Sequence, residues 1–273
     1  MTLTELVRMT LEEDVGPGDL TTEACVDANA RGTAQIYAKQ ALVVAGHAPA
    51  GEVFRQLGAT YESRAGEGES IDDRVTIAHI EGPLRSLLTG ERSALNFLMR
   101  LCGIATHVRA VVAAAGGVRV VDTRKTTPLL RALEKDAVRA GGAGNHRFGL
   151  FDGILIKDNH IVAAGGIAAA VRRARLAAHP LMRIECEVET LVELQEALEA
   201  GVDVVLLDNM DDAVLLQAVE RTAGRATLEA SGNMTAERIS RLRSAGLDYF
   251  SMGGLIHQAR WADLSMRILP VGR

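Results

Sequence analysis

The 273-residue chain has few aromatic side chains, few cysteines and no excess of basic charge. Aromatic residues make up 3% of it, which leaves little for stacking on the bases of a nucleic acid. The formal net charge is −5, whereas nucleic-acid-binding domains are usually basic. The cysteines, Cys25, Cys102 and Cys186, do not have metal-ligand spacing and are typical of reduced thiols. We therefore expect no nucleic-acid partner and a cytoplasmic location.

Long apolar runs are also missing. No stretch reaches the length that a membrane-spanning helix needs, and the N-terminus lacks the apolar core of a signal peptide. Instead, Thr2 and Glu5 have the spacing of a capping box, which predicts that a helix begins here. We expect a soluble protein without a membrane partner.

The second half of the chain contains short apolar runs that alternate with segments of helical spacing. The runs are residues 118–121, 153–156, 183–189, 202–207, 226–230 and 247–252. This alternation is typical of parallel strands that are buried on both faces. A closed barrel needs eight strands. Because six are recognisable, the pattern predicts an open, incomplete parallel α/β barrel.

The first part of the chain has a different pattern. Short β-like runs occupy residues 31–38, 41–45, 60–63 and 76–81, and helical spacing begins at residue 89 and again at residue 105. We expect an N-terminal α+β sandwich domain over 1–103 and a barrel domain over 104–260. The tail, 261–273, is expected to pack back on the first domain.

Charged residues follow the predicted strands. Asp122, Thr123, Arg124 and Lys125 follow the first strand, and Lys157 follows the second. In parallel sheets, ligands bind at the carboxyl ends of the strands. Arg and Lys together can hold the oxygens of an anion, because the guanidinium is a planar fork and the ammonium is a point charge. The pattern therefore predicts an active site for an anionic substrate, although an isolated Arg-Lys pair is more often a solvated loop.

Two further features add cationic groups to this edge. The glycine-rich turn 141–144 leads into His146 and Arg147, which we interpret as an anion clamp; His146 alone would more often be structural. Lys157 has a second interpretation, since Schiff-base enzymes place a lysine at the end of a barrel strand. With two arginines expected nearby, anion binding is the preferred role.

Carboxylates and small residues complete the predicted site. Glu185, Glu187 and Glu189 alternate along one strand and therefore share one face. With Asp208 they offer oxygen ligands that suit Mg²⁺, while an internal salt-bridge lattice is the alternative for at least one of them. The turns 231–233 and 252–254 end the last two strands and can bind phosphate through backbone N–H groups.

These motifs resemble quinolinate phosphoribosyltransferase, the carboxylating nicotinate-nucleotide pyrophosphorylase family. The resemblance runs in order over nearly the whole chain. The matching stretches are residues 13–22, 88–96, 122–128, 145–147, 152–161, 185–189, 206–210, 228–233 and 251–257.

The resemblance implies a reaction and a set of roles. Quinolinate and phosphoribosyl pyrophosphate would give nicotinate mononucleotide, pyrophosphate and CO₂, with Mg²⁺, in de novo NAD biosynthesis. The chain would form a homodimer or a higher oligomer in which Arg92 reaches the neighbouring subunit's site. The implied substrate ligands are Thr123, Arg124, His146, Arg147 and Lys157 for quinolinate, Lys125 for pyrophosphate, Glu187 and Asp208 for ribose and metal, and Ser231, Gly232, Asn233, Met252, Gly253 and Gly254 for the 5′-phosphate. Lys125, Lys157, Glu187 and Asp208 would be the catalytic residues.

The sequence departs from the family pattern at a few positions. Leu129 occupies a position where glycine is usual, Asn233 replaces a frequent glycine, and the order at 143–144 and the residues at 254–257 differ mildly. None of these changes removes a charged group. A Schiff-base lyase, a related paralogue of the kind found beside molybdate transporters and a non-catalytic anion-binding protein remain the alternative hypotheses.

Overall fold

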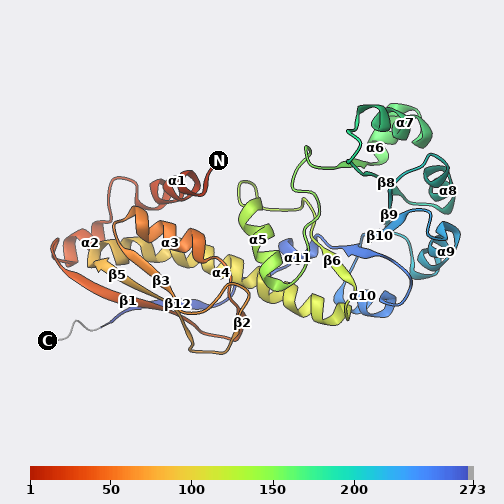
Figure 1. Ribbon diagram of the computed structural model, residues 1–273. Helices are drawn as coiled ribbons and strands as arrows, with labels where there is room; N and C mark the ends of the chain where they lie inside the picture. The colour runs from red at the N-terminus through yellow and green to blue at the C-terminus, as the bar shows by residue number, and fades with distance from the viewer. Residues whose placement is uncertain (270–273) are drawn as a thin grey trace. The chain divides into compact units, whose positions relative to one another are not determined.

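The computed structural model describes residues 1–269, which form two compact units (Figure 1). The first unit comprises Met1–Arg109, Thr127–Gly142 and the segment from Gln258 onward, and the second comprises Ala110–Thr126 and Ala143–His257. Segment 127–142 thus belongs to the first unit, whereas the sequence boundary at residue 103 assigned it to the barrel domain.

The elements alternate in the order expected. The helices are α1 (Leu3–Val15), α2 (Leu20–Cys25), α3 (His47–Gln56), α4 (Leu84–Ala115), α5 (Arg131–Gly141), α6 (Asp158–Ala164), α7 (Ile167–Ala177), α8 (Leu191–Glu199), α9 (Asp212–Thr222), α10 (Ala236–Leu242) and α11 (Gly254–His257). The strands are β1 (Arg31–Ala38), β2 (Leu42–Val43), β3 (Thr60–Ser63), β4 (Ser70–Ile71), β5 (Thr76–Pro83), β6 (Arg119–Val121), β7 (Ile154–Ile156), β8 (Ile184–Val188), β9 (Val204–Asp208), β10 (Thr227–Ser231), β11 (Tyr249–Ser251) and β12 (Leu264–Ile268).

The first unit contains an antiparallel sheet with the strand order β12-β1-β5-β3. Its inward side chains alternate along the strands, as in β1, where Ala34, Ile36 and Ala38 are fully buried. These residues pack in one core with Phe54 of α3, and α1 lies beside α3 (Figure 1). The expected α+β sandwich is confirmed. Strand β12 belongs to the expected tail, of which residues 270–273 lie outside the described residues.

Helix α4 is one continuous helix of 32 residues, so the prediction of two separate helices was wrong. Gly103, in its middle, does not end the helix. A Cβ atom at this position would overlap the backbone carbonyl oxygen of Arg260, so glycine allows the helix and segment 260–262 to pack closely. By length and composition, α4 is also the helix in residues 1–269 that could span a membrane; half of its apolar window is buried inside the fold, as in a core helix.

Leu129 lies in the turn before α5 and has a φ of 67°, in the left-handed region. Its side chain is exposed, so packing does not compensate for the strain that a side chain meets in this conformation. This explains why glycine is favoured at the position. The leucine is therefore tolerated at a cost in stability.

The second unit contains a parallel sheet with the order β6-β11-β10-β9-β8-β7. Within residues 1–269, these six strands are the six predicted from the apolar runs. Strands β6 and β7 stand at the two ends of the order, so the sheet is an open barrel and the predicted fold class is confirmed. Strand β8 is buried along its whole length, as expected for a strand covered on both faces.

Candidate active site

The parallel sheet brings the carboxyl ends of its strands to one edge. Strand β6 is followed there by 122–125, β7 by Lys157, β9 by Asn209, and β10 and β11 by the turns 232–233 and 252–254. In register, Ser231 lies beside Asp208, and Ser251 beside Val121. The predicted residues of the second unit therefore gather at the edge where parallel sheets bind ligands.

A fully buried carboxylate connects β6 with the segment that carries His146 and Arg147. Asp122 accepts hydrogen bonds from the backbone N–H of His146 (2.9 Å) and from Nδ2 of Asn145 (2.7 Å). Gly144 also forms a parallel bridge with Val121. This segment consequently runs along β6 on the side away from β11, and Asp122 acts as its anchor.

His146 lies between two buried glutamates. Its Nε2 is 3.2 Å from the carboxylates of both Glu185 and Glu229. Burial disfavours its charge, but these two carboxylates outweigh that effect and raise its pKa to about 10. The backbone N–H of Arg147 points at Nδ1 (2.8 Å), so a second ring proton requires this contact to be given up. Both ring nitrogens therefore face groups of the protein: Nε2 faces the two carboxylates, and Nδ1 faces the backbone N–H of Arg147.

The two glutamates differ in their own titration. Burial, together with the charge of Glu229, raises the pKa of Glu185 to about 7 despite the opposing hydrogen bond to His146. Burial also acts on Glu229, yet the hydrogen bond and charge of His146 prevail and lower its pKa. The Tyr249 hydroxyl donates to Glu185 at 3.4 Å. This cluster corresponds to the salt-bridge lattice that the sequence offered as an alternative for one of the three strand glutamates.

Sequence reasoning missed Glu229 and Tyr249. The signal for Glu229 was a single carboxylate within the buried run 226–230, which gives no information about its partner. Among residues 1–269, His146, Glu185 and Glu229 are the set whose possible metal-ligand atoms lie within 4.8 Å of one another. The imidazole itself supplies the positive charge between the carboxylates when it is protonated, so this set is an ionic cluster rather than the predicted metal site.

The other two strand glutamates have different surroundings. Glu187 is buried and forms an ion pair with Lys157, which follows the neighbouring strand β7. Glu189 lies past the end of β8 and is exposed. In an ion pair the lysine is a charged ammonium, whereas a lysine that forms a Schiff base must react as the neutral amine. The geometry therefore favours the anion-binding interpretation of Lys157.

Arg147 and Arg124 share a positive region. Partial burial and then the charge of Arg124 lower the pKa of Arg147. One guanidinium nitrogen of Arg147 donates to the carbonyl of Gly153 at 2.8 Å, which leaves its remaining donors for a ligand. A bound anion would relieve the repulsion between the two arginines.

The loops after β6 and β11 meet at Gly253. A Cβ atom on Gly253 would lie 2.8 Å from Cδ of Lys125 and 3.3 Å from Oγ1 of Thr123. Thr123 accepts a hydrogen bond from the backbone N–H of Lys125, and Met252 donates to Val121. The close approach explains why glycine occupies position 253, and it places the predicted phosphate-binding loop 252–254 beside Lys125 and Thr123.

The loops after β9 and β10 are also joined. Asn209 donates to the carboxylate of Asp208 (2.6 Å) and accepts from Nδ2 of Asn233 (3.1 Å). Asp208 is partly exposed, as a carboxylate that binds a ligand needs to be. Arg92 is exposed on α4 and belongs to the first unit, so the second unit alone does not contain it.

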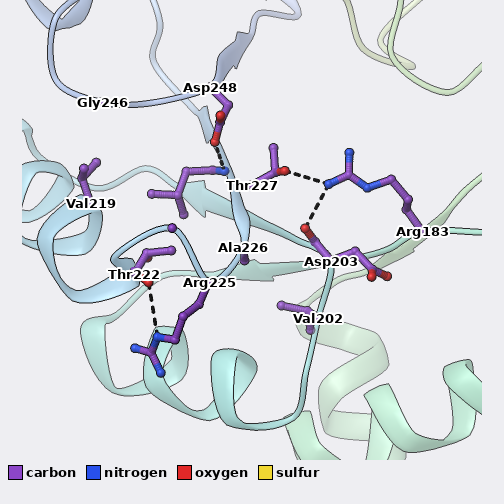
Figure 2. A pocket seen from close by; sticks show the side chains of 12 residues that line it. Arg183, Val202, Asp203, Val219, Thr222, Arg225, Ala226, Thr227, Gly246 and Asp248 are labelled. Atoms are coloured by element: carbon purple, nitrogen blue, oxygen red, sulfur yellow. Dashed lines mark hydrogen bonds between the residues drawn. The ribbon is translucent and has the colours of Figure 1, made fainter.

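A cavity of about 500 Å³ lies at the amino ends of the strands, opposite the predicted site (Figure 2). Its charged groups already serve the fold. Arg183 donates to the carbonyl of Asp203 and to Oγ1 of Thr227, and Asp248 accepts from the backbone of Leu228. None of the predicted site residues lines this cavity. Its polar groups fix the starts of the strands.

The fold and this edge define a class: an α/β-barrel protein with cations, carboxylates and glycine turns arranged for anionic reactants. Comparisons with known proteins identify the family. Residues 19–102 match the N-terminal domain of quinolinate phosphoribosyl transferase and residues 104–267 match its C-terminal domain. The chain belongs to the quinolinate phosphoribosyltransferase family.

Individual relatives are similar over almost their full lengths. A probable nicotinate-nucleotide pyrophosphorylase (carboxylating) of Bacillus subtilis is 42% identical, with 94% of this chain and 90% of the relative covered. The corresponding protein of Synechocystis is 44% identical over 95% and 90%. The crystal structure of NadC from Streptococcus pyogenes superposes with a TM-score of 0.93 at 41% identity, covering 98% of this chain and 97% of the other.

Proposed function

We propose that this protein transfers the phosphoribosyl group of phosphoribosyl pyrophosphate to the ring nitrogen of quinolinate. The products are nicotinate mononucleotide, pyrophosphate and CO₂, and the reaction belongs to de novo NAD biosynthesis. The observation that carries the proposal is the full-length family match together with the meeting of its charged motifs at one sheet edge.

Quinolinate carries two carboxylates, which the cationic side chains of the site bind. Arg124 and Arg147 bind one or both of them, with Lys157 beside them and Thr123 as a hydroxyl donor. His146, whose pKa is raised by Glu185 and Glu229, contributes its positive charge beside Arg147. Holding the dianion in this way aims the pyridine nitrogen at the ribose carbon, so the reaction gains from orientation.

Phosphoribosyl pyrophosphate occupies the opposite side of the site. Ser231–Asn233 and Met252–Gly254 bind its 5′-phosphate through backbone N–H groups other than that of Met252, which donates to Val121. Lys125 faces its pyrophosphate. Glu187 and Asp208 bind the ribose hydroxyls. When pyrophosphate leaves, positive charge develops on the ribose, and these carboxylates stabilise it.

The decarboxylation requires no covalent bond to the protein. The pyridine nitrogen bonds to the anomeric carbon as the bond to pyrophosphate breaks. The resulting pyridinium accepts the electron pair of the adjacent carbon–carboxylate bond as CO₂ departs, and a proton then replaces the carboxylate on that carbon. The site residues bind and orient the reactants and balance their charges.

Magnesium suits the acidic part of this site. Glu187 and Asp208 supply oxygen donors from neighbouring strands, and Mg²⁺ is usually held by one or two carboxylates together with water and substrate phosphates. Bound there, the ion would neutralise charge on the pyrophosphate. Lys157 pairs with Glu187, so the lysine and the metal compete for this carboxylate.

Two further proposals concern the whole molecule. A homodimer, or a higher oligomer, would allow Arg92, which is exposed, to complete a neighbouring subunit's site. A cytoplasmic location is supported by the free thiols of Cys25, Cys102 and Cys186.

The decisive experiment is the release of pyrophosphate from phosphoribosyl pyrophosphate, with nicotinate mononucleotide and CO₂ measured in parallel. We expect release that depends on both quinolinate and Mg²⁺, with the three products in equal amounts. Nicotinate, which lacks one carboxylate, is the matched control and should not replace quinolinate. Product formation without quinolinate, or none with it, would contradict the proposal. Borohydride trapping of a carbonyl substrate on Lys157 would support the lyase instead.

A further inference from the structure

Arg238 joins the loops that follow β9 and β10. It lies on α10, and its side chain is only 14% exposed. Its two terminal nitrogens donate to the carbonyl of Gly232 (3.1 Å) and to the carbonyl of Met210 (2.5 Å). Its Nε donates to Asp212 on α9 at 2.9 Å. A single planar guanidinium therefore holds two separate loops and a helix at once.

The same two loops are also connected by asparagine side chains. Asn233 donates to Asn209, and Asn209 donates to the carboxylate of Asp208. The backbone N–H of Asn209 also donates to the carbonyl of Ser231 at 3.1 Å. This chain of bonds leads from the predicted phosphate loop to the carboxylate predicted to bind ribose.

The backbone between these contacts leaves little freedom. Asn209 and Asn233 have φ angles of 53° and 49°, in the left-handed region, which asparagine tolerates better than most residues. Gly232 has a φ of 81°, and a Cβ atom there would collide with the Asn209 side chain. The two loops thus interlock.

We propose that Arg238 is a positioning residue that fixes the loop Asp208–Met210 and the loop Ser231–Asn233 as one rigid cradle. The inference rests on the proposed function, in which Asp208 binds the ribose and Ser231–Asn233 bind the 5′-phosphate. These groups are joined within one substrate, so their separation in the protein must match their separation in phosphoribosyl pyrophosphate. Arg238 sets that separation without contacting the substrate.

The key variant is Arg238→Lys, because lysine keeps the positive charge but cannot donate in the planar fork that reaches three acceptors. Arg241→Lys is the matched control. Arg241 lies on the same helix and forms an exposed ion pair with the same Asp212 (3.4 Å). Arg238→Met removes the charge as well, so comparing it with Arg238→Lys separates the contribution of the positive charge from that of the guanidinium hydrogen bonds.

In steady-state assays we expect Arg238→Lys to raise the KM for phosphoribosyl pyrophosphate about tenfold, as the loss of charge-assisted hydrogen bonds implies. The KM for quinolinate should stay within about twofold of the wild-type value, since no quinolinate contact changes. Arg241→Lys should match the wild type in both. Wild-type KM values in Arg238→Lys would overturn the inference, because charge alone would then suffice. Equal rises in both KM values would also overturn it, since they indicate a general structural defect.

Direct binding provides a readout that does not require turnover. In the proposed site, ribose 5-phosphate reaches both the loop Asp208–Met210 and the loop Ser231–Asn233, whereas inorganic phosphate does not reach the loop Asp208–Met210. By calorimetry, Arg238→Lys should weaken ribose 5-phosphate binding more than phosphate binding. Equal weakening would overturn the inference. This measurement stands even if the wild type releases no pyrophosphate, which would contradict the proposed function separately.

The asparagine link offers a second, independent variant. Asn209→Gly keeps the left-handed backbone without strain and removes the amide that reaches Asp208. We expect the same selective rise in the KM for phosphoribosyl pyrophosphate, with an unfolding temperature close to that of the wild type. A change confined to quinolinate would overturn the proposed connection between these loops.

Discussion

Lys157 and Glu187 face each other from the ends of neighbouring parallel strands and form an ion pair. The lysine side chain is 44% exposed, so the pair is open to solvent on one side. Each partner is also expected to bind a different substrate. The ion pair therefore lies where the quinolinate and ribose parts of the proposed site meet.

Replacing Lys157 should impair function far more than folding. A solvent-exposed ion pair contributes about 0–1 kcal/mol, so Lys157→Ala should unfold close to the wild-type temperature. Its KM for quinolinate should rise at least about tenfold because a charged donor is lost. Steady-state kinetics and thermal unfolding test both expectations. The control is Lys39→Ala in the first unit, because Lys39 is also an exposed, ion-paired lysine. Lys135 is buried and is therefore unsuitable. Normal kinetics in Lys157→Ala would remove Lys157 from the site.

Arg147→Ala should abolish stabilisation by quinolinate. A ligand that binds only the folded state raises the unfolding temperature. In the proposed site, quinolinate would bind where burial and the charge of Arg124 destabilise the charge of Arg147, so a clear shift is expected in the wild type. Differential scanning fluorimetry with increasing quinolinate measures it. An undiminished shift in Arg147→Ala would show that quinolinate binds elsewhere.

Mixing two inactive variants tests the shared site. If Arg92 acts in the neighbouring subunit, a hybrid dimer of Arg92→Ala and Arg147→Ala contains one intact site. We expect about a quarter of wild-type activity from random exchange of two subunit types, because half the dimers are hybrids with one of two sites intact. Exchange is confirmed with differently tagged subunits. Hybrids that form without any activity would place Arg92 outside the neighbouring site.

His146 should make stability depend on pH. Its folded pKa of about 10 exceeds the usual value of 6.5. Its contribution is thus fully present below pH 6.5 and is lost as the pH rises through 10. The unfolding temperature should therefore fall over this range, and less steeply in His146→Gln. The raised pKa values of Cys102 and Cys186, both about 12 because of burial, act equally in both proteins. The exposed His179→Gln is the control, and identical slopes for wild type and His146→Gln would contradict the assignment.

Gly103→Ala should destabilise the first unit, although alanine is the better helix former. The added Cβ would overlap the carbonyl of Arg260, and backbone atoms on both sides would have to move. Overpacking of this kind costs about 1–3 kcal/mol. Denaturant unfolding measures the change. An unchanged or higher stability would mean that segment 260–262 moves aside freely.

The sequence was sufficient for the six strands of the parallel sheet and for the charged residues at their ends, but it did not predict β4 or β12. Apolar runs between amphipathic segments predicted the parallel sheet, since both features follow directly from burial on two faces. Local pattern could not show partners that are distant in the chain. Glu229 gave no sign of pairing with His146, and Arg238 resembled any exposed cation on a short helix. The helical spacing that begins again at residue 105 was interpreted as a second helix, and the carbonyl that Gly103 accommodates within the continuous helix lies some 160 positions later in the chain.

The open edge of the parallel sheet, between β6 and β7, has an evolutionary consequence. Strands β6 and β7 are the two edge strands of the parallel sheet. The segment 144–147, which carries His146 and Arg147, is attached to β6 through Gly144 and the carboxylate of Asp122. Residues of this segment can be substituted without disrupting the pairing of neighbouring strands. Under the proposed function, selection for a different aromatic acid would therefore act first on segment 144–147, while the loops proposed to bind ribose and phosphate stay unaltered.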